Sequence, residues 1–443
     1  MQNDLTKGSI LKNLIFFSLP YLLSCFLQTF YGMADLLIAG QFNGSSTITA
    51  ISTGSQIMHM LTVIIVGLAM GSTVLISQAA GSGNLRHASE IIGSSISLFT
   101  VVSVAATGIM LLCTNGIIKI MAVPAESVSE AKIYLIICFL GIPFITAYNI
   151  LSSIFRGIGD SKTPMYFVAI ACLANILLDF LFIGTFHMGA AGAALGTVVS
   201  QTLSVFCAFV SIIRKDMGIS LKREDFLPKG QILTKVIKVG LPVSIQDGLI
   251  QVSFMVITMI ANGRGITIAA AVGIVEKIIG FLFLIPSAML SSVSAIAAQN
   301  VGAGRPKRAR QTLFYATAIA FCCGLIFAFI CQFTSEPLIS CFSKDASVIR
   351  LGGEYLRSYS FDCAIAGIHF CFSGFFCAYG YSMVSFIHNI LSIALIRIPG
   401  AFFASKYYPD TLFEMGLAAP LGSLLSAIIC ALFYLALRKK GKL

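Results

Sequence analysis

The chain has 443 residues, of which 57% are hydrophobic and 11% are charged, and its mean hydropathy is +0.92. Soluble domains contain about 25% charged residues, so this composition excludes a soluble protein and indicates an integral membrane protein. The net charge of +11 does not indicate a nucleic-acid partner, because the basic residues are distributed among loops and tails instead of forming one patch.

Apolar runs recur almost without interruption from about residue 14 to about residue 437. A membrane-spanning helix needs about 20 such residues, so the sequence predicts an all-α polytopic membrane protein with twelve transmembrane helices. No small-residue cleavage pattern follows the first run, and we expect it to remain as an uncleaved span. Most of the 29 Lys and Arg lie on one side of this arrangement, which predicts that both termini are cytoplasmic.

The two halves of the chain resemble each other. "SLPYLLSCFLQTFYG" corresponds to "GLPVSIQDGLIQVSF", "ISQAAGSGNLRHASE" to "IAAQNVGAGRPKRAR" and "MGAAGAALGTVVSQ" to "MGLAAPLGSLLSA", at offsets of about 221 to 227 residues. Six helices separate equivalent positions, so both repeats have the same orientation. We therefore expect two pseudo-symmetric six-helix lobes around a central cavity: an N-lobe over 1–213, a basic cytoplasmic linker over 214–235 and a C-lobe over 236–443. Such lobes suit alternating access.

The first span carries a polar stripe that ends at a carboxylate. Ser24, Gln28, Tyr31 and Asp35 follow spacings of four, three and four residues, which place them on one helix face. A charge at the centre of a spanning helix costs about 2.5–3.5 kcal/mol on insertion scales. We therefore expect Asp35 to face the interior of the bundle and to have a function.

Three further spans of the first half have polar faces. Their residues are Thr146, Asn149, Ser153 and Arg156 in the fourth span, Asn175 and Asp179 in the fifth, and Thr197, Ser200 and Ser204 in the sixth. Buried carboxylates can take up a proton, and together with amide and hydroxyl oxygens they can coordinate a hard cation such as sodium. Interhelical hydrogen bonding is the alternative role, and it is favoured for the serines.

The second half has no copy of Asp35, because Ile257 stands at the aligned position. It has polar faces of its own, formed by Ser244, Asp247, Gln251 and Thr258 in the seventh span and by Ser358, Asp362, His369 and Ser373 in the tenth. We predict that the substrate side of the central cavity is lined by Gln28, Tyr31, Asn149, Asp247, Gln251, Asp362 and His369. Carboxylates there would attract an amphipathic cation. Hydrogen bonds between the lobes are the alternative role for the second-half residues.

Motifs for enzymatic chemistry are absent from the sequence. It contains no G-x-x-x-x-G-K-[ST] loop, no G-x-S-x-G elbow and no H-E-x-x-H pair. The five histidines are scattered along the chain, so we expect neither a metal site nor a cofactor. The sequence indicates a protein that is not an enzyme and that would drive transport with an ion gradient.

The most specific stretches resemble multidrug and toxic compound extrusion (MATE) transporters. They are "LPYLLSCFLQTFYGMADLLIAG", "SSIFRGIGDSKTPM", "LANILLDFLFIGTFHMGAAGAALGTVVSQ", "GLPVSIQDGL" and "AIAAQNVGAGRPKRAR". The resemblance implies an antiporter that exports amphipathic, cationic drugs or metabolites in exchange for protons or sodium ions. It also implies a monomer in the plasma (inner) membrane of a prokaryote, and an ion-coupling site at Asp35, Asn175, Asp179 and Thr197. One branch of the family has a glutamate in the seventh span, where this chain has Ile250.

Two alternative functions are weighed against this one. A lipid-linked oligosaccharide flippase of the same superfamily would be expected to have a strongly cationic cavity and often extra spans, whereas the predicted cavity is acidic and twelve spans are counted. A channel or a non-transporting membrane scaffold would give no reason for the two-lobe repeat or for the matched prolines Pro20 and Pro242.

Overall fold

The computed structural model describes residues 4–214 and 221–443, and within them the chain forms helices, turns and loops but no strand. Residues 215–220 of the predicted linker lie outside the described residues. The chain divides into two compact units. The first contains Leu19–Gly240, and the second contains Leu241–Leu443 together with Leu5–Ser18.

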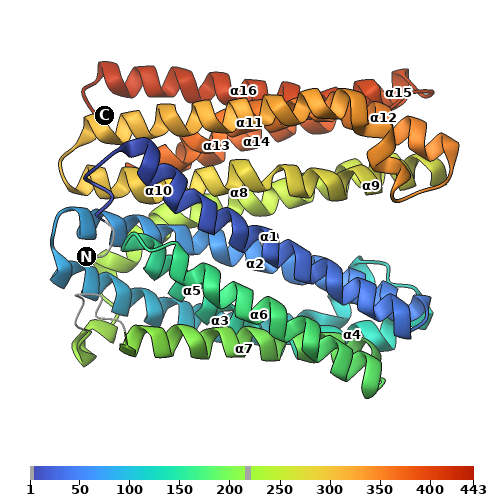
Figure 1. Cartoon of the computed structure of the whole chain (residues 1–443), viewed down its shortest axis with the longest axis horizontal. Coiled ribbons are helices and arrows are strands. Elements are labelled where there is room, and N and C mark those ends of the chain that lie inside the picture. The colour runs from blue at the N-terminus through green and yellow to red at the C-terminus, as the bar shows by residue number, and fades with distance from the viewer. Residues whose placement is uncertain (1–3, 215–220) are drawn as a thin grey trace. The chain divides into compact units, whose positions relative to one another are not determined.

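The first unit is built from the helices of the N-terminal repeat (Figure 1). They are α1 (Ile10–Phe42), α2 (Ser45–Gly81), α3 (Leu85–Ile120), η1 (Ala125–Ser127), α4 (Val128–Leu140), α5 (Ile142–Gly157), α6 (Lys162–Asp179), η2 (Phe180–Thr185), α7 (Gly189–Arg214) and η3 (Arg223–Phe226).

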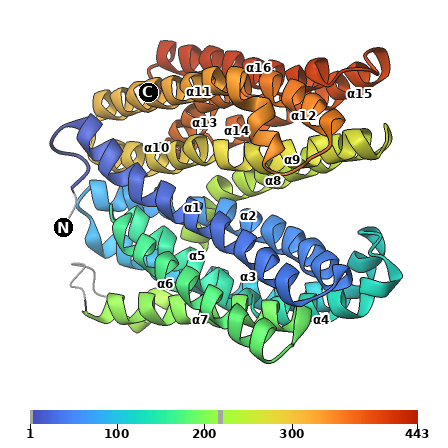
Figure 2. The ribbon, with the colours of Figure 1, turned by 45° about the vertical axis from the view of Figure 1, so that its right-hand side comes forward.

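The second unit has a similar but not identical order of helices. Its helices are α8 (Gly230–Asn262), α9 (Ile266–Leu282), α10 (Leu284–Gly302), α11 (Pro306–Ser340), α12 (Ala346–Tyr359), α13 (Phe361–Ala378), α14 (Ser382–Ser392), η4 (Ile393–Arg397), α15 (Ile398–Tyr407) and α16 (Phe413–Lys439). Figure 2 shows α11, α13 and α16 side by side, and α13 packs against both of the others.

The unit boundaries differ from those expected from the linker, because α1 and α8 are each shared between the units. The first turns of α1, up to Ser18, belong to the second unit, and the first turns of α8, up to Gly240, belong to the first unit. Both boundaries lie two residues before a proline inside the helix, Pro20 in α1 and Pro242 in α8. Proline removes one backbone hydrogen bond from a helix, so each division falls at a locally weakened turn.

Eleven helices among the described residues are long and apolar enough to cross a membrane, and the bent pair α4–α5 raises the number to twelve. The pair is bent by 46° where Gly141 separates the two helices, and Pro143 follows in the first turn of α5. Proline cannot donate the next helical hydrogen bond, which explains the bend. The prediction of an all-α protein with twelve spans is confirmed when this pair is counted as one span.

Large apolar side chains cover the outer surfaces of the helices. On α3, Leu112 and Val101 are 87% and 67% exposed, and on α11 Phe333 is 72% exposed. Exposed apolar surface of this extent requires a lipid environment. Inside the first unit, α2 packs against α5 and α6 packs against α7, which brings the polar faces of α6 and α7 together.

The described end of the linker is held on α3. The Asp225 carboxylate of η3 accepts hydrogen bonds from Arg86 Nη1 and from the Lys222 backbone N–H, each at 2.8 Å, and its Oδ1 forms an ion pair with Arg86 Nη2 at 2.8 Å. Burial favours a higher pKa for Asp225, but the Lys222 N–H and the Arg86 guanidinium outweigh it and lower that pKa. This ion pair therefore fixes the residues that precede α8.

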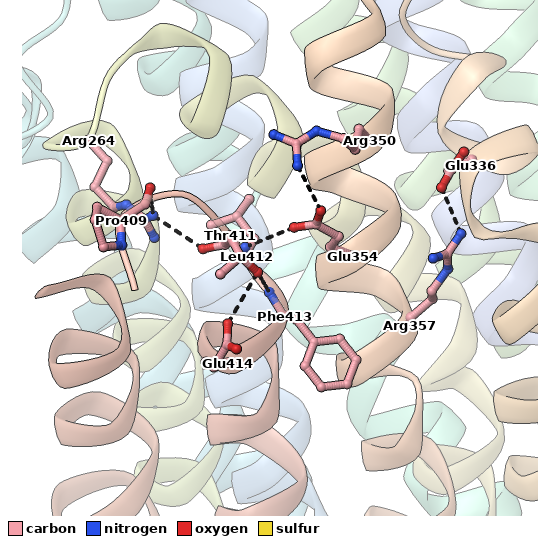
Figure 3. Close-up of polar contacts among 10 residues, drawn as sticks. All are labelled: Arg264, Glu336, Arg350, Glu354, Arg357, Pro409, Thr411, Leu412, Phe413 and Glu414. Carbon is pink, nitrogen blue, oxygen red and sulfur yellow. Dashed lines mark hydrogen bonds and ion pairs between the residues drawn. The ribbon is translucent and has the colours of Figure 1, made fainter. Parts of the chain in front are cut away.

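The loop before α16 is held in the same way by ionic groups (Figure 3). Arg264 donates to the backbone carbonyls of Tyr408, Pro409 and Thr411. Glu354 of α12 accepts from the backbone N–H of Leu412. These contacts supply hydrogen-bond partners for carbonyls of the loop and for the Leu412 N–H directly before α16.

Candidate functional site

Two carboxylates meet inside the first unit, where α1, α6 and α7 lie close together. Asp35 of α1 is 4% exposed and Asp179 of α6 is fully buried. The Asp35 carboxyl interacts with the side chains of Asp179, Asn175 and Thr197, and the Thr197 hydroxyl lies 3.4 Å from Asp35 Oδ2. The structure thus brings together all four residues predicted for ion coupling.

The acid pair and the neighbouring Asn175 have unused polar atoms. Oδ1 of Asp35, both oxygens of Asp179 and both polar side-chain atoms of Asn175 have no hydrogen-bond partner within the described part of the chain. Neither carboxylate forms an ion pair with a basic residue there. Two neighbouring buried carboxylates cannot both remain ionised without a compensating charge, so the site can take up a proton or bind a cation through its oxygens.

Two local backbone features position Asp179. The α-helix α6 changes into the π-helix η2 directly after this residue, and single π turns often occur at functional sites. On the facing helix α7, Gly196 lies against the carboxylate, because a Cβ added there would overlap Asp179 Oδ1 and lie 3.6 Å from Asn175 Nδ2. The absence of a side chain at Gly196 therefore makes room for the acid pair.

Tyr31, predicted to line the substrate cavity, is part of a contact that the sequence analysis missed. Its hydroxyl accepts a hydrogen bond from Gln201 Nε2 at 3.1 Å. Gln201 is 7% exposed and its Oε1 has no partner in the described protein. The signal was available, because Gln201 follows Thr197 by four residues and so lies on the same face of α7.

Gln28 and Asn149, also predicted for the substrate cavity, line a small cavity of about 30 Å³ in the first unit. Its other lining residues come from α1, α2, α5 and α6 and are Tyr21, Ser24, Cys25, Val66, Tyr148, Arg156 and Pro164. The polar lining groups are hydroxyls, amides and one guanidinium, and no carboxylate lines the cavity. This cavity and the acid pair therefore differ in charge.

In the second unit, Asp362 forms a buried ion pair. Arg397 Nη2 lies 2.6 Å from Asp362 Oδ2, and the two side chains are 8% and 0% exposed. The sequence analysis did not pair Arg397 with Asp362. Because the two residues lie on α13 and η4, no spacing within one helix could reveal the contact. The partner compensates the charge of Asp362, unlike the charges of the acid pair.

His369 lies next to this ion pair. Its Nε2 is 3.3 Å from Ser423 Oγ of α16, and its ring centroid is 5.4 Å from that of His388. His388 in turn contacts Ser373 Oγ at 2.9 Å. The fold thus gathers two of the scattered histidines, although no group of three His, Cys, Asp or Glu within residues 4–214 and 221–443 is arranged to hold a metal ion.

Asp247 and Gln251 of α8 are only partly buried. Within the described residues, the Asp247 carboxylate forms neither an ion pair nor a hydrogen bond. Thr258 lies further along the same helix and donates to Glu276 Oε1 at 2.8 Å. Among the four residues predicted for the cavity from the second half, Asp247 is therefore a carboxylate whose charge remains available.

The comparisons with known proteins agree with one another. The sequence model of the family described as MatE matches residues 20–181 and 242–403, so the two matches begin at the paired prolines. The chain is 28% identical over 432 residues to the probable multidrug resistance protein YpnP of Bacillus subtilis (strain 168), covering 97% of this chain and 96% of that protein.

Two further likenesses extend over nearly the whole chain. The multidrug export protein MepA of Staphylococcus saprophyticus is 26% identical over 429 residues, covering 96% of this chain and 93% of MepA. A crystal structure of MATE in complex with MaL6 superposes with a TM-score of 0.91 at 22% identity, covering 98% of this chain and 99% of that chain. At this identity the structural likeness shows the fold alone.

Proposed function

The chain belongs to the multidrug and toxic compound extrusion (MATE) family of membrane transporters, and we propose that it is an antiporter that exports amphipathic, cationic drugs or metabolites in exchange for protons or sodium ions. The family consists of transporters and not of enzymes. The observation that carries the proposal is the buried pair Asp35–Asp179 with unused oxygens and no basic partner in the described protein.

The coupling step follows from the charge of this pair. A proton or a sodium ion that enters the site neutralises the repulsion between Asp35 and Asp179, with Asn175 and Thr197 as additional oxygen donors. When the ion leaves, the repulsion returns, so the lobe has a different charge in its loaded and empty states. Alternating access of the two lobes would convert this difference into export, since each charge that crosses the membrane yields about 2.3 kcal/mol per 100 mV.

The experiment is an efflux assay in proteoliposomes with imposed pH and sodium gradients, applied separately to a panel of organic cations. Asp35→Asn and Asp179→Asn should remove gradient-driven efflux while expression and melting temperature stay near those of the wild type. Asp410→Asn is the matched control, since Asp410 is an exposed loop residue. Normal pumping by both buried variants would place the coupling site elsewhere.

The proposal for the substrate rests on Asp247. Because this carboxylate has no ion-pair partner in the described protein and lies partly buried on α8, it is suited to contact a cationic substrate. Asp247→Asn should then reduce the apparent affinity for a monovalent cationic compound more than for a neutral one. Equal losses for the two compounds would instead indicate a contact that opens and closes during transport.

We also propose a place and an orientation for the protein: a monomer in the prokaryotic plasma membrane with both termini in the cytoplasm. Cysteines introduced at Asn43, in the turn after α1, and at Lys222, in the linker, should react with an impermeant maleimide from opposite sides of the membrane. Labelling of the parent protein, which has 13 cysteines, supplies the background. Labelling of both new cysteines from the outside would contradict the topology.

A further inference from the structure

Arg156 of α5 is a buried cation with no carboxylate partner among the described residues. The residue is 9% exposed, its Nη2 donates to Ser153 Oγ at 3.0 Å, and its guanidinium carbon lies 5.1 Å from the centroid of the Tyr21 ring. Its Nε has no acceptor within the described protein. The guanidinium therefore keeps a hydrogen-bond donor and its full charge available to a ligand.

The surroundings of Arg156 do not compensate this charge. No carboxylate lies within ion-pair distance in the described residues, whereas the equally buried Arg397 has Asp362 at 2.6 Å. The Tyr21 ring face and one hydroxyl are weaker partners than an anion. Because an isolated buried charge costs several kcal/mol, the site is incomplete unless an anion binds.

The cavity beside Arg156 selects the kind of anion. Its volume of about 30 Å³ corresponds to one small chemical group, and a carboxylate is a small anionic group. Guanidinium and carboxylate match in a two-point hydrogen-bonded geometry. The amides of Gln28 and Asn149 line the same cavity, and Asn149 uses Nδ2 to donate to the Ile145 carbonyl, which leaves its second N–H for a ligand.

The cavity is separate from the acid pair. Gln28 is the residue of α1 in the cavity lining that is nearest to Asp35 in the sequence, and these residues are 7 positions apart, which corresponds to about 10 Å along the helix axis. A carboxylate bound at Arg156 therefore does not occupy the site of the coupling ion. The first unit thus has an anionic site, the acid pair, and a cationic site, the Arg156 cavity, at different positions along α1.

We propose that the cavity binds the carboxylate of a zwitterionic amphipathic solute, with Arg156 as its counter-ion. This assignment rests on the proposed function, since it gives the exported cation a second, negatively charged group. It also assigns a purpose to the amide-lined part of the predicted substrate cavity, which offers no carboxylate to a cation.

The test compares two fluorescent dyes that differ at one group. Rhodamine 110 carries a free carboxylate, and rhodamine 123 is its methyl ester. Their dissociation constants are measured by fluorescence polarisation with the purified full chain. Arg156→Gln should weaken rhodamine 110 relative to rhodamine 123 by about tenfold, as expected for loss of a charged hydrogen bond, and Arg156→Lys should restore part of this preference. Lys132→Gln, which removes an exposed charge of α4, should leave the ratio unchanged.

Several outcomes would overturn the assignment. They are equal binding of both dyes by the wild type, no saturable binding of rhodamine 110, or an unchanged ratio in Arg156→Gln. If Arg156→Gln does not fold, wild-type melting temperatures are decisive: benzoate should stabilise the protein, and neither benzamide nor chloride at equal concentration should match it. Equal stabilisation by chloride would assign the cavity to an inorganic anion. Gradient-driven export of rhodamine 123 tests the proposed function separately, because that dye lacks the carboxylate.

Discussion

Gly196→Ala should disable transport because the added methyl group displaces the Asp179 carboxylate, although Asp179 itself is unchanged. The added Cβ would overlap Asp179 Oδ1 and crowd Asn175, so the acid must rotate away from Asp35 or α7 must move. Overpacking of this kind costs about 1–3 kcal/mol, and alanine's higher helix propensity returns about 0.5–1 kcal/mol. We expect a small net loss of stability, with a shift of about 2–4 °C in melting temperature per kcal/mol, and efflux as low as in Asp179→Asn.

Gly192→Ala provides a matched control on the same helix. A Cβ at Gly192 would lie 3.1 Å from the Phe182 backbone and side chain, so it also creates crowding. That contact involves no ionisable group. Both variants should therefore melt at similar, slightly lowered temperatures, and only Gly196→Ala should lose gradient-driven efflux from proteoliposomes. Wild-type efflux by Gly196→Ala, or equal losses in the two variants, would refute the reasoning.

Three further predictions concern ionic contacts. The low pKa of Asp225 means that its pairing with Arg86 contributes full stability above the ordinary value of 3.8 and loses it as the pH falls below that value. The melting temperature of the wild type should therefore fall more between about pH 5 and about pH 3 than that of Asp225→Asn does. Equal decreases in the two proteins would contradict the assignment. Arg397→Gln should destabilise the second unit by about 3–5 kcal/mol by leaving Asp362 buried and unpaired, and adding Asp362→Asn should recover part of this in denaturant unfolding. Arg264→Gln should make the loop before α16 more sensitive to proteolysis at a cost of about 1–3 kcal/mol, because carbonyl partners are lost, and an unchanged cleavage rate would count against this.

The sequence could predict which residues share a helix face. Periodicity alone placed Asn175 and Asp179 on one face of the fifth span and grouped Asp35 with Tyr31, since these spacings are fixed by helix geometry. That Asp35 and Asp179 belong to one site came from the family resemblance. Neighbours on different helices depend on how helices pack, and a repeat of 3.6 residues contains no information about this.

The residues that were missed show the same limit. The pairing of Asp362 with Arg397 joins two helices, and the contact of His369 with His388 joins residues that looked scattered along the chain. Arg156 was recognised as part of a polar stripe, but its lack of a carboxylate partner is a property of the three-dimensional neighbourhood. Charge compensation can therefore be judged only once the packing is known.

The internal repeat shows at which equivalent residues the two units differ in charge. Thr197 follows Gly196 in "ALGT" of α7, and Ser423 follows Gly422 in "PLGS" of α16. The first glycine lies against Asp179, and the second lies against Arg397, whose Cγ would be 2.7 Å from an added Cβ.

The hydroxyl that follows each glycine contacts an acid, Asp35 in the first unit and Asp362 in the second. The equivalent Gly-Thr and Gly-Ser dipeptides thus accommodate a carboxylate pair in one unit and an ion pair in the other. In the second unit the protein's own guanidinium compensates the acid permanently. In the first unit no basic residue of the described chain compensates the acids, and under the proposed function the compensating charge is an ion that arrives and leaves during transport.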